Sequence, residues 1–215
     1  MKFEKTEVWG FEHAIRGMRN PLESWDKSDS CYIDKRFNDQ FHIGKNDLAL
    51  MQKLIKAGSE HRKFLRQIFV AVDITAPLYW WKEFDTYKVG TVANSTSTMH
   101  KLASTPITID CFEMDDFEDC KDDSNVYVSA IWIESITRLE KLRQTYNATK
   151  DKRYWKELIR LLPESWLQKR TITMNYENIL NMYRQRKNHK LTEWSKSFCD
   201  WVKTLPYAEE LICLE

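Results

Sequence analysis

The rarity of glycine and proline is the sequence feature that most limits how this chain can fold. Its 215 residues include only five Gly and five Pro, and no linker-like run separates one part of the chain from another. Without such a run there is no position at which one domain would end and the next begin. We therefore predict that residues 1–215 form a single domain.

Charge and cysteine usage exclude several classes of protein. The formal net charge is +1, which gives no electrostatic reason to expect a nucleic acid or a membrane as partner. No apolar run approaches the length of a membrane span, and Met1–Glu7 lacks the apolar segment of a signal peptide. The five cysteines form no CxxC pair and the five histidines are scattered. We therefore expect reduced thiols, no metal site and a cytoplasmic location.

The pattern of apolar residues predicts a helix-rich α+β domain with few strands. A short strand is expected within residues 1–10, and a second within residues 64–75, where β-branched residues are frequent. The expected helices are residues 12–18, 46–57, 77–88, 126–147, 151–162, 175–188 and 190–204. Residues 19–44 are expected to be irregular, a long connection of the kind that often carries function.

Single residues predict where several of these helices begin and end. Asn46 or Asp47 can cap the helix that Gly58 ends. Pro77 stands where proline starts a helix well, and Pro163 breaks the helix that precedes it.

Residues 110–123 form a strongly acidic segment. Its eight acidic side chains are Asp110, Glu113, Asp115, Asp116, Glu118, Asp119, Asp122 and Asp123. A divalent-metal loop is one interpretation, but the central glycine of a calcium loop is absent. The pattern favours a solvated acidic loop.

The helix expected from Asn175 has a chemically mixed face. A helix turns about 100° per residue, so one broad face carries Asn175, Ile179, Met182, Arg186 and His189. A purely structural face is more uniformly apolar. A buried Arg186 needs an anionic or carbonyl partner, which is either a ligand or a carboxylate such as that of Glu193.

Two polar segments allow a functional and a structural interpretation each. Residues 94–98 (Asn-Ser-Thr-Ser-Thr) either line a pocket for a phosphate or a base edge or form a turn that caps a helix entering Met99 and His100. His61-Arg62-Lys63 with Arg66 is either an anion site or a solvated turn before a strand. The chain contains no catalytic triad motif, P-loop or GxGxxG sequence.

Ordered landmarks along the chain resemble the flavin-dependent thymidylate synthases. Asp47–Gly58 is similar to the family's helix before its first FAD-contacting strand, and Gln67–Pro77 is similar to that strand and the Ala-Pro after it. Pro163 lies twelve residues before Asn175, which is the family's spacing, and Arg170 falls on a family Arg between them. The residues that resemble the family's last core helix and the segment after it are Asn175, Leu180, Asn181, Arg186 and Trp194.

The segment from Thr86 to Met99 departs from the family's signature. That signature is Arg-His-Arg, two residues, Ser, and shortly afterwards Asn-Glu-x-Ser-x-Arg-Tyr. The matching residues here are Thr86-Tyr87-Lys88, Thr91, Ala93-Asn94, Thr96, Thr98 and Met99. Lys88 keeps a positive charge, but the first Arg, the His and the late Arg, which hold flavin and nucleotide phosphate in the family, are replaced. Lys82, Arg66 and Arg160 are candidates to compensate.

The resemblance implies a fold, a reaction and an assembly. The fold is a helix-rich α+β domain with a small, mostly antiparallel sheet, and the assembly is a homotetramer with sites shared between subunits. The reaction is reductive methylation of dUMP, or a related pyrimidine nucleotide, to dTMP. Methylenetetrahydrofolate donates the carbon, reduced FAD carries the hydride and NADPH reduces the flavin. The alternative is a catalytically inactive homologue of the same fold that binds or sequesters a nucleotide.

The resemblance also implies roles for individual residues. Arg186 is expected to be catalytic, because a cation in a dry pocket stabilises charge that builds on the uracil carbonyls. The residues expected to bind the flavin are Tyr87, Lys88, Val89, Asn175 and Asn181. Those expected to bind the nucleotide are Lys82, Glu83, Asn94, Ser95, Thr96, Thr98 and Arg160.

Overall fold

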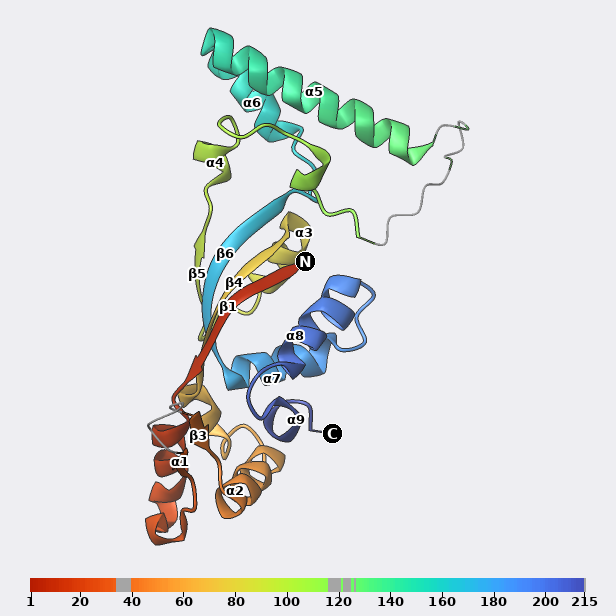
Figure 1. The fold of residues 1–215 in the computed structure, drawn as a ribbon. Coiled ribbons are helices and arrows are strands. Elements are labelled where there is room, and N and C mark those ends of the chain that lie inside the picture. Colours follow the sequence, from red (N-terminus) through yellow and green to blue (C-terminus); the bar gives the residue numbers. More distant parts are fainter. Residues whose placement is uncertain (34–39, 116–120, 122–124, 126, 215) are drawn as a thin grey trace. The chain divides into compact units, whose positions relative to one another are not determined.

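The computed structural model describes residues 1–33, 40–115, 121, 125 and 127–214 (Figure 1). Contacts between Cα atoms divide the chain into two compact units. The first unit consists of Met1, Thr75–Asp85 and Asn94–Arg170. The second unit consists of Lys2–Ile74, Thr86–Ala93 and Thr171–Glu215.

Two small sheets account for the strands of the described residues. The larger is four-stranded, with the order β1-β4-β6-β5. Its strands are β1 (Lys2–Trp9), β4 (Phe69–Pro77), β5 (Val92–Ser95) and β6 (Leu167–Asn175). The smaller is the antiparallel pair β2 (Cys31–Ile33) and β3 (Gln40–His42), in which Cys31 lies opposite His42. Alternate residues of β4 are buried, as expected of a strand with one face on a core.

Helices are more frequent than strands among the described residues of the second unit. The helical elements that precede β4 are α1 (Phe11–Arg19), η1 (Asn20–Leu22), η2 (Trp25–Lys27), α2 (Lys45–Lys56) and η3 (Lys63–Gln67). Those that follow β6 are α7 (Tyr176–Arg186), the π-helix η5 (Glu193–Phe198), α8 (Cys199–Lys203) and α9 (Ala208–Leu211). Large side chains fill the core of this unit: Tyr176, Ile179, Leu180, Met182, Trp194 and Phe198 are each 0% exposed.

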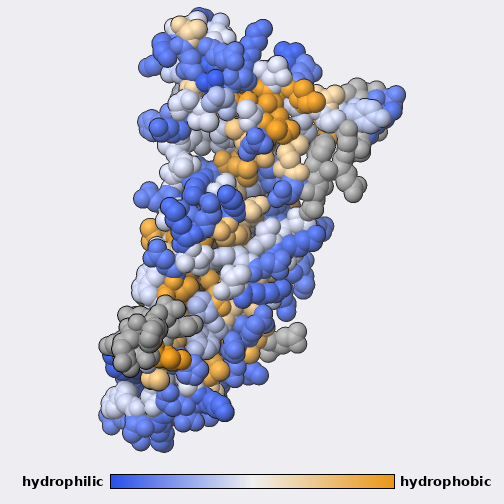
Figure 2. Space-filling model, in the orientation of Figure 1, coloured by the Kyte–Doolittle hydropathy of each residue, from blue (hydrophilic) through white to orange (hydrophobic). Residues whose placement is uncertain are grey.

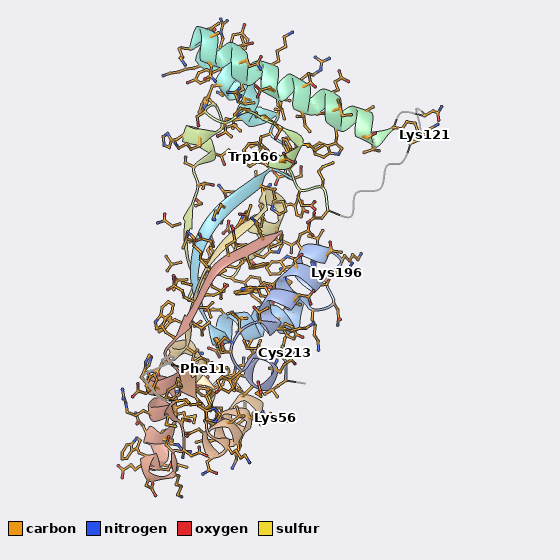
Figure 3. The ribbon with its side chains drawn as sticks, in the orientation of Figure 1. Phe11, Lys56, Lys121, Trp166, Lys196 and Cys213 are labelled. Carbon is orange, nitrogen blue, oxygen red and sulfur yellow. The ribbon has the colours of Figure 1, made fainter. Side chains whose placement is uncertain are left out.

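The first unit has a hydrophobic core of its own. Its helical elements are α3 (Leu78–Phe84), α4 (Thr98–Lys101), η4 (Ile109–Cys111), α5 (Val128–Thr149) and α6 (Lys152–Arg160), and α5 packs against α6. The core consists of Leu102, Ile107, Phe112, Leu139 and Leu158. Trp166, labelled in Figure 3 just before β6, packs against this core and makes an edge-on contact with the ring of Phe112.

Most helix predictions are confirmed, but the capping prediction for α2 is wrong. Its N-cap is Gly44, and neither Asn46 nor Asp47 caps the helix. Instead the carboxylate of Asp29, from the preceding loop, accepts hydrogen bonds from the backbone N–H groups of Asn46 and Asp47 at 2.9 and 3.0 Å. The end of the helix agrees with the prediction, since Gly58 has a φ of +108°.

Asp47 does not cap α2 and instead forms a buried ion pair with Arg19. Its Oδ1 accepts from Nε of Arg19 at 2.6 Å, and the two side chains are 0% and 4% exposed. Its Oδ2 accepts from the hydroxyls of Ser28 and Ser30 at 2.7 and 2.6 Å and from two backbone N–H groups, those of Asp29 and Ser30. This network joins the end of α1, the loop after it and the start of α2.

The strand predictions are less accurate. The strand expected at residues 64–75 begins only at Phe69, because Lys63–Gln67 forms a 3-10 helix. The helix expected to reach residue 88 ends at Phe84. Residues 92–95 form strand β5 and residues 167–175 form strand β6, neither of which was predicted.

The acidic segment cannot be assigned from the structure. Asp116, Glu118, Asp119, Asp122 and Asp123 lie outside the described residues. Within the described part of the chain, no group of three or more His, Cys, Asp or Glu side chains is placed to hold a metal ion. The helices in the described residues are also too short or too polar to cross a bilayer.

Candidate functional site

The expected flavin-binding residues all belong to the second unit, and two of them, Val89 and Asn175, meet at the start of α7. The side chains of Asn175 and Asn178 cap each other's backbone N–H groups, with N–O distances of 3.0 and 3.3 Å. Asn178 also donates from Nδ2 to the carbonyl of Val89 at 2.7 Å. The loop 86–93 is therefore fixed on the N-terminal turn of α7.

Gly90 makes this close approach possible. Its φ is +82°, and a Cβ atom there would lie 2.9 Å from Asn178 Oδ1 and 3.0 Å from Asn175 Nδ2. Any larger residue would collide with the reciprocal cap and would be strained in this backbone conformation.

The candidate catalytic residue, Arg186, lies at the other end of α7 and is held by aromatic residues. Its Nε donates to the hydroxyl of Tyr87 at 2.8 Å, and that hydroxyl donates to Oε1 of Gln185 at 3.0 Å. The centre of the guanidinium is 5.0 Å from the ring of Trp194 and 5.5 Å from the ring of Tyr87. These distances allow cation–π attraction to both rings.

The sequence suggested a ligand or Glu193 as the partner of Arg186, and the phenol of Tyr87 is a third kind of partner. Glu193 is buried, at 6% exposed, and begins the π-helix that carries Trp194. A single-turn π-helix often marks a functional position. Arg186 is half-buried, so its charge lies where an interaction with a ligand is screened less than at an open surface.

Asn181 takes part in a different cluster. Its Oδ1 accepts from Nη2 of Arg62 at 3.1 Å, and Nε of Arg62 also donates to Glu177 at 3.2 Å. Arg66 pairs with the second oxygen of the same Glu177. The prediction of a solvated turn at residues 61–66 is therefore wrong for Arg62, which is 12% exposed, whereas Arg66 binds the same almost buried carboxylate and stays 56% exposed.

The expected nucleotide-binding residues all belong to the first unit, and the two cations among them form ion pairs. Lys82 forms an ion pair with Glu164 at 2.6 Å, and Arg160 pairs with Glu157 at 2.5 Å. Glu83 is half-buried on α3. Lys82 and Arg160 would each have to leave a carboxylate before binding a phosphate.

The polar residues of β5 form a more connected group. Asn94, Ser95 and Thr96 are exposed, and the N–H of Thr96 donates to the carbonyl of Lys169 on β6. Nε2 of Gln168 donates to the carbonyl of Thr96 at 2.9 Å and to the hydroxyl of Thr98 at 3.4 Å. The structural interpretation of this segment is confirmed, because the Ser97 side chain caps α4 by accepting from His100 N.

Gln168 and Arg170 extend this group, and the sequence prediction did not include them as site residues. Nε of Arg170 donates to Gln168 Oε1 at 3.0 Å, and Nη1 donates to Asp85 at 2.7 Å. The guanidinium of Arg170 lies 4.2 Å from the centre of the Trp81 ring. The two residues are spaced by two along β6, so recognising that strand would have placed them on one face.

A cavity of 1010 Å³ in the second unit lies next to the turn that carries Arg62 and Arg66. It is lined by residues of α1, α2 and η3 and by the turn before η3, which includes His61. No expected catalytic, flavin-binding or nucleotide-binding residue lines it.

Sequence comparison finds no match, whereas structural comparison finds proteins of similar fold. No protein-family model and no curated protein matches the sequence. A structure of the flavin-dependent thymidylate synthase ThyX from Helicobacter pylori, complexed with FAD and dUMP, matches over 100% of both chains with a TM-score of 0.70 and 17% identity. A second structure of ThyX from Helicobacter pylori with FAD and dUMP covers 96% of this chain and 94% of its own, with a TM-score of 0.65 and 16% identity.

The chain has the fold of the flavin-dependent thymidylate synthases. The predicted class, helix-rich α+β with a small, mostly antiparallel sheet, is confirmed.

The second unit also offers donors of the kind that FAD requires. Asn175 Nδ2 and Asn181 Nδ2 have no hydrogen-bond acceptor among the described residues, and Lys88 is exposed without a carboxylate partner there. FAD presents carbonyl and phosphate oxygens, which are acceptors that such donors satisfy. The residues present therefore fit this cofactor.

Proposed function

We propose that this chain is a flavin-dependent thymidylate synthase-like enzyme that methylates dUMP, or a related pyrimidine nucleotide, to dTMP. The observation that carries the proposal is the setting of Arg186, held by Tyr87 and Trp194 on a fold that matches such an enzyme over its whole length. FAD would supply the hydride when bound, NADPH would reduce it and methylenetetrahydrofolate would donate the carbon.

In this proposal Arg186 stabilises the reacting pyrimidine. Uracil C6 accepts a nucleophile or hydride only when the charge building on the ring carbonyls is stabilised, and a fixed cation does this well. The hydrogen bond to Tyr87 and the rings of Tyr87 and Trp194 restrict the guanidinium. Little reorganisation is then needed when the charge develops.

The other proposed roles divide between flavin-binding residues in the second unit and nucleotide-binding residues in the first unit. The flavin is held by Tyr87, Lys88, Val89, Asn175 and Asn181 in the second unit. The nucleotide is held by Lys82, Glu83, Asn94, Ser95, Thr96, Thr98 and Arg160 in the first unit. Gln168 and Arg170 orient the polar group of β5 through their hydrogen bonds.

We also propose that residues 1–215 act as one domain within a cytoplasmic homotetramer. The support for this assembly is the exposure of apolar residues among and next to the proposed flavin-binding residues: Val89 is 90% exposed and Val92 is 71% exposed. Figure 2 shows apolar residues reaching a surface that is otherwise largely hydrophilic. Apolar residues exposed next to a site are typical of surfaces covered by another subunit.

A second candidate function is nucleotide binding without catalysis. The observation that favours it is the replacement of the family's Arg-His-Arg by Thr86-Tyr87-Lys88, together with the engagement of the Tyr87 hydroxyl by Arg186 and Gln185. Each charge-assisted bond lost to the flavin lowers affinity by about tenfold to a hundredfold.

A spectroscopic and kinetic experiment separates the two functions. The purified protein is examined for flavin absorbance before and after incubation with FAD, and then assayed for dTMP formation from dUMP, methylenetetrahydrofolate and NADPH. The enzyme function predicts bound flavin and turnover that Arg186→Ala abolishes, while Arg138→Ala, which removes an exposed arginine of α5, leaves it unchanged. A protein that cannot be loaded with FAD but binds dUMP by calorimetry would replace the first function by the second.

A further inference from the structure

Arg184, on α7, lies near Arg62 and has no partner of its own among the residues that the structure describes. Among the described residues it makes no hydrogen bond, ion pair or ring contact. Partial burial and the nearby guanidinium of Arg62 both lower the pKa of Arg184. Two guanidinium groups of like charge that lie near each other repel, and an anion that binds both removes this repulsion.

The cluster around Arg184 is built from two elements of the second unit. Glu177, Asn181 and Arg184 are spaced by four and three residues along α7, which places them on one face of the helix. Arg62 and Arg66, from the turn before β4, reach this face and bind the two oxygens of Glu177. Arg62 is also fixed by Asn181.

Existing contacts orient two of the three arginines. Glu177 is 9% exposed and holds Nε of Arg62 and Nε of Arg66, while Arg62 itself is 12% exposed. Arg66 is 56% exposed, so an ion in solution can reach it. Arg184 is also exposed. The group is therefore partly rigid and open to a ligand at the same time.

The charges in this cluster do not balance. Glu177 is shared between Arg62 and Arg66, and Glu60 acts on Arg66 as a second, more distant carboxylate. Three guanidinium groups thus face two carboxylates, and both carboxylates act on Arg66. Among the described residues, no carboxylate contributes to the shift in the pKa of Arg184. The excess positive charge lies on the side of the cluster formed by Arg62 and Arg184.

We propose that Arg62, Arg66 and Arg184 form a binding site for a phosphate group. The fork of N–H donors on a guanidinium matches two oxygens of a phosphate, and several arginines are the usual means of binding a dianion. A phosphate ester of a dinucleotide and free pyrophosphate share this chemistry. The inference uses neither Arg186 nor the expected nucleotide-binding residues, but Asn181 is one of the proposed flavin-binding residues, so the case of a bound dinucleotide rests on the proposed function.

Calorimetry in a phosphate-free buffer tests the site, with inorganic pyrophosphate and FAD as separate probes. We expect Arg184→Gln to weaken pyrophosphate binding by about tenfold, the effect of one charge-assisted hydrogen bond, and Arg184→Lys to weaken it less. Arg184 is exposed and unpaired, so these variants are expected to fold. The matched control is Arg16→Gln, which removes an exposed arginine of α1 that also lacks a partner among the described residues.

The two probes identify the occupant. If Arg184→Gln weakens FAD binding as well, the phosphates of a dinucleotide occupy the site; if it weakens pyrophosphate binding alone, a free anion does. Equal effects of Arg184→Gln and Arg16→Gln, or no binding of either probe to the unmodified protein, would overturn the proposal. Arg186→Ala is expected to leave pyrophosphate binding unchanged, so turnover that persists in this variant while pyrophosphate still binds would count against the proposed function alone.

Discussion

Replacing Asp47 by asparagine should destabilise the protein strongly. Asp47→Asn preserves the shape of the side chain but removes the charge opposite Arg19 and turns one acceptor oxygen into an N–H donor. The buried carboxylate accepts five hydrogen bonds, from Arg19, Ser28, Asp29 and twice from Ser30. Removing one partner of a buried ion pair costs about 3–5 kcal/mol.

The lower part of that range is expected here, because Arg19 keeps two backbone acceptors. Its Nη1 and Nη2 donate to the carbonyls of Ser24 and Lys27, both at 3.1 Å. We therefore expect the free energy of unfolding to fall by about 3 kcal/mol and the melting temperature to fall by about 6–12 °C. Urea unfolding followed by tryptophan fluorescence at neutral pH measures the first quantity, and thermal unfolding measures the second.

The pH dependence of stability gives an independent check on Asp47. Burial raises its pKa, but hydrogen bonds from Ser30, Ser28 and Arg19 outweigh burial, so the pKa is lowered from 3.8. At acid pH the unfolded chain therefore binds a proton that the folded chain does not. The contribution of Asp47 is present above the unfolded pKa and is lost as the pH falls through the lower folded value.

The control for this experiment is Asp26→Asn, which changes an exposed carboxylate that has no partner among the described residues. We expect it to change stability by less than about 0.5 kcal/mol. The reasoning fails if Asp47→Asn costs less than about 1 kcal/mol, or if it leaves the loss of stability between about pH 5 and pH 2 as steep as in the unmodified protein.

The contacts of Tyr87, Gly90 and Glu140 lead to three further predictions. Tyr87→Phe removes only the hydroxyl that accepts from Arg186, so we expect kcat with dUMP to fall about tenfold with little change in KM; steady-state kinetics showing a higher KM at unchanged kcat would contradict this role. Gly90→Ala adds a Cβ 2.9 Å from Asn178 Oδ1 at a φ of +82°, so we expect the free energy of unfolding in urea to fall by about 1–3 kcal/mol. Gly58→Ala is the control for backbone strain, because a Cβ there meets no atom within 4 Å at a similarly positive φ. Hydrogen bonds from Arg143 outweigh burial and lower the pKa of Glu140 to about 2. Glu140→Gln should therefore remove stability that is present at neutral pH and lost below about pH 4. Thermal unfolding from pH 7 to pH 2 should show the melting temperatures of the variant and the unmodified protein converging in acid.

The helices of this protein were predictable because their signals are local. Gly58 and Pro163 end their helices where expected, and Asp151 caps α6. The cap of α2 was not predictable, because Asp29 provides it from a loop. Asp47 looked like a cap in the sequence, but its oxygens are taken by Arg19 and two serines that lie 17 to 28 residues away.

Strand β6 escaped prediction for a related reason. Its first four residues, Leu167–Arg170, are mostly long and polar, and their extended conformation depends on pairing with strands distant in the sequence. Once β6 was missed, the group formed by Gln168 and Arg170 could not be assembled. Likewise, the hydrogen bond between Arg186 and Tyr87 joins residues 99 apart, a separation across which periodicity carries no information.

The interleaving of the two units along the chain has a consequence for synthesis on the ribosome. Phe3 stacks on Trp201 with ring centroids 4.8 Å apart, and Phe11 makes an edge-on contact with Tyr176 at 5.5 Å. The first aromatic residues to leave the exit tunnel therefore reach these partners only after most of the chain has been synthesised. Chains that stall or are truncated before α7 would leave these rings in water, where they are prone to aggregate or to bind chaperones.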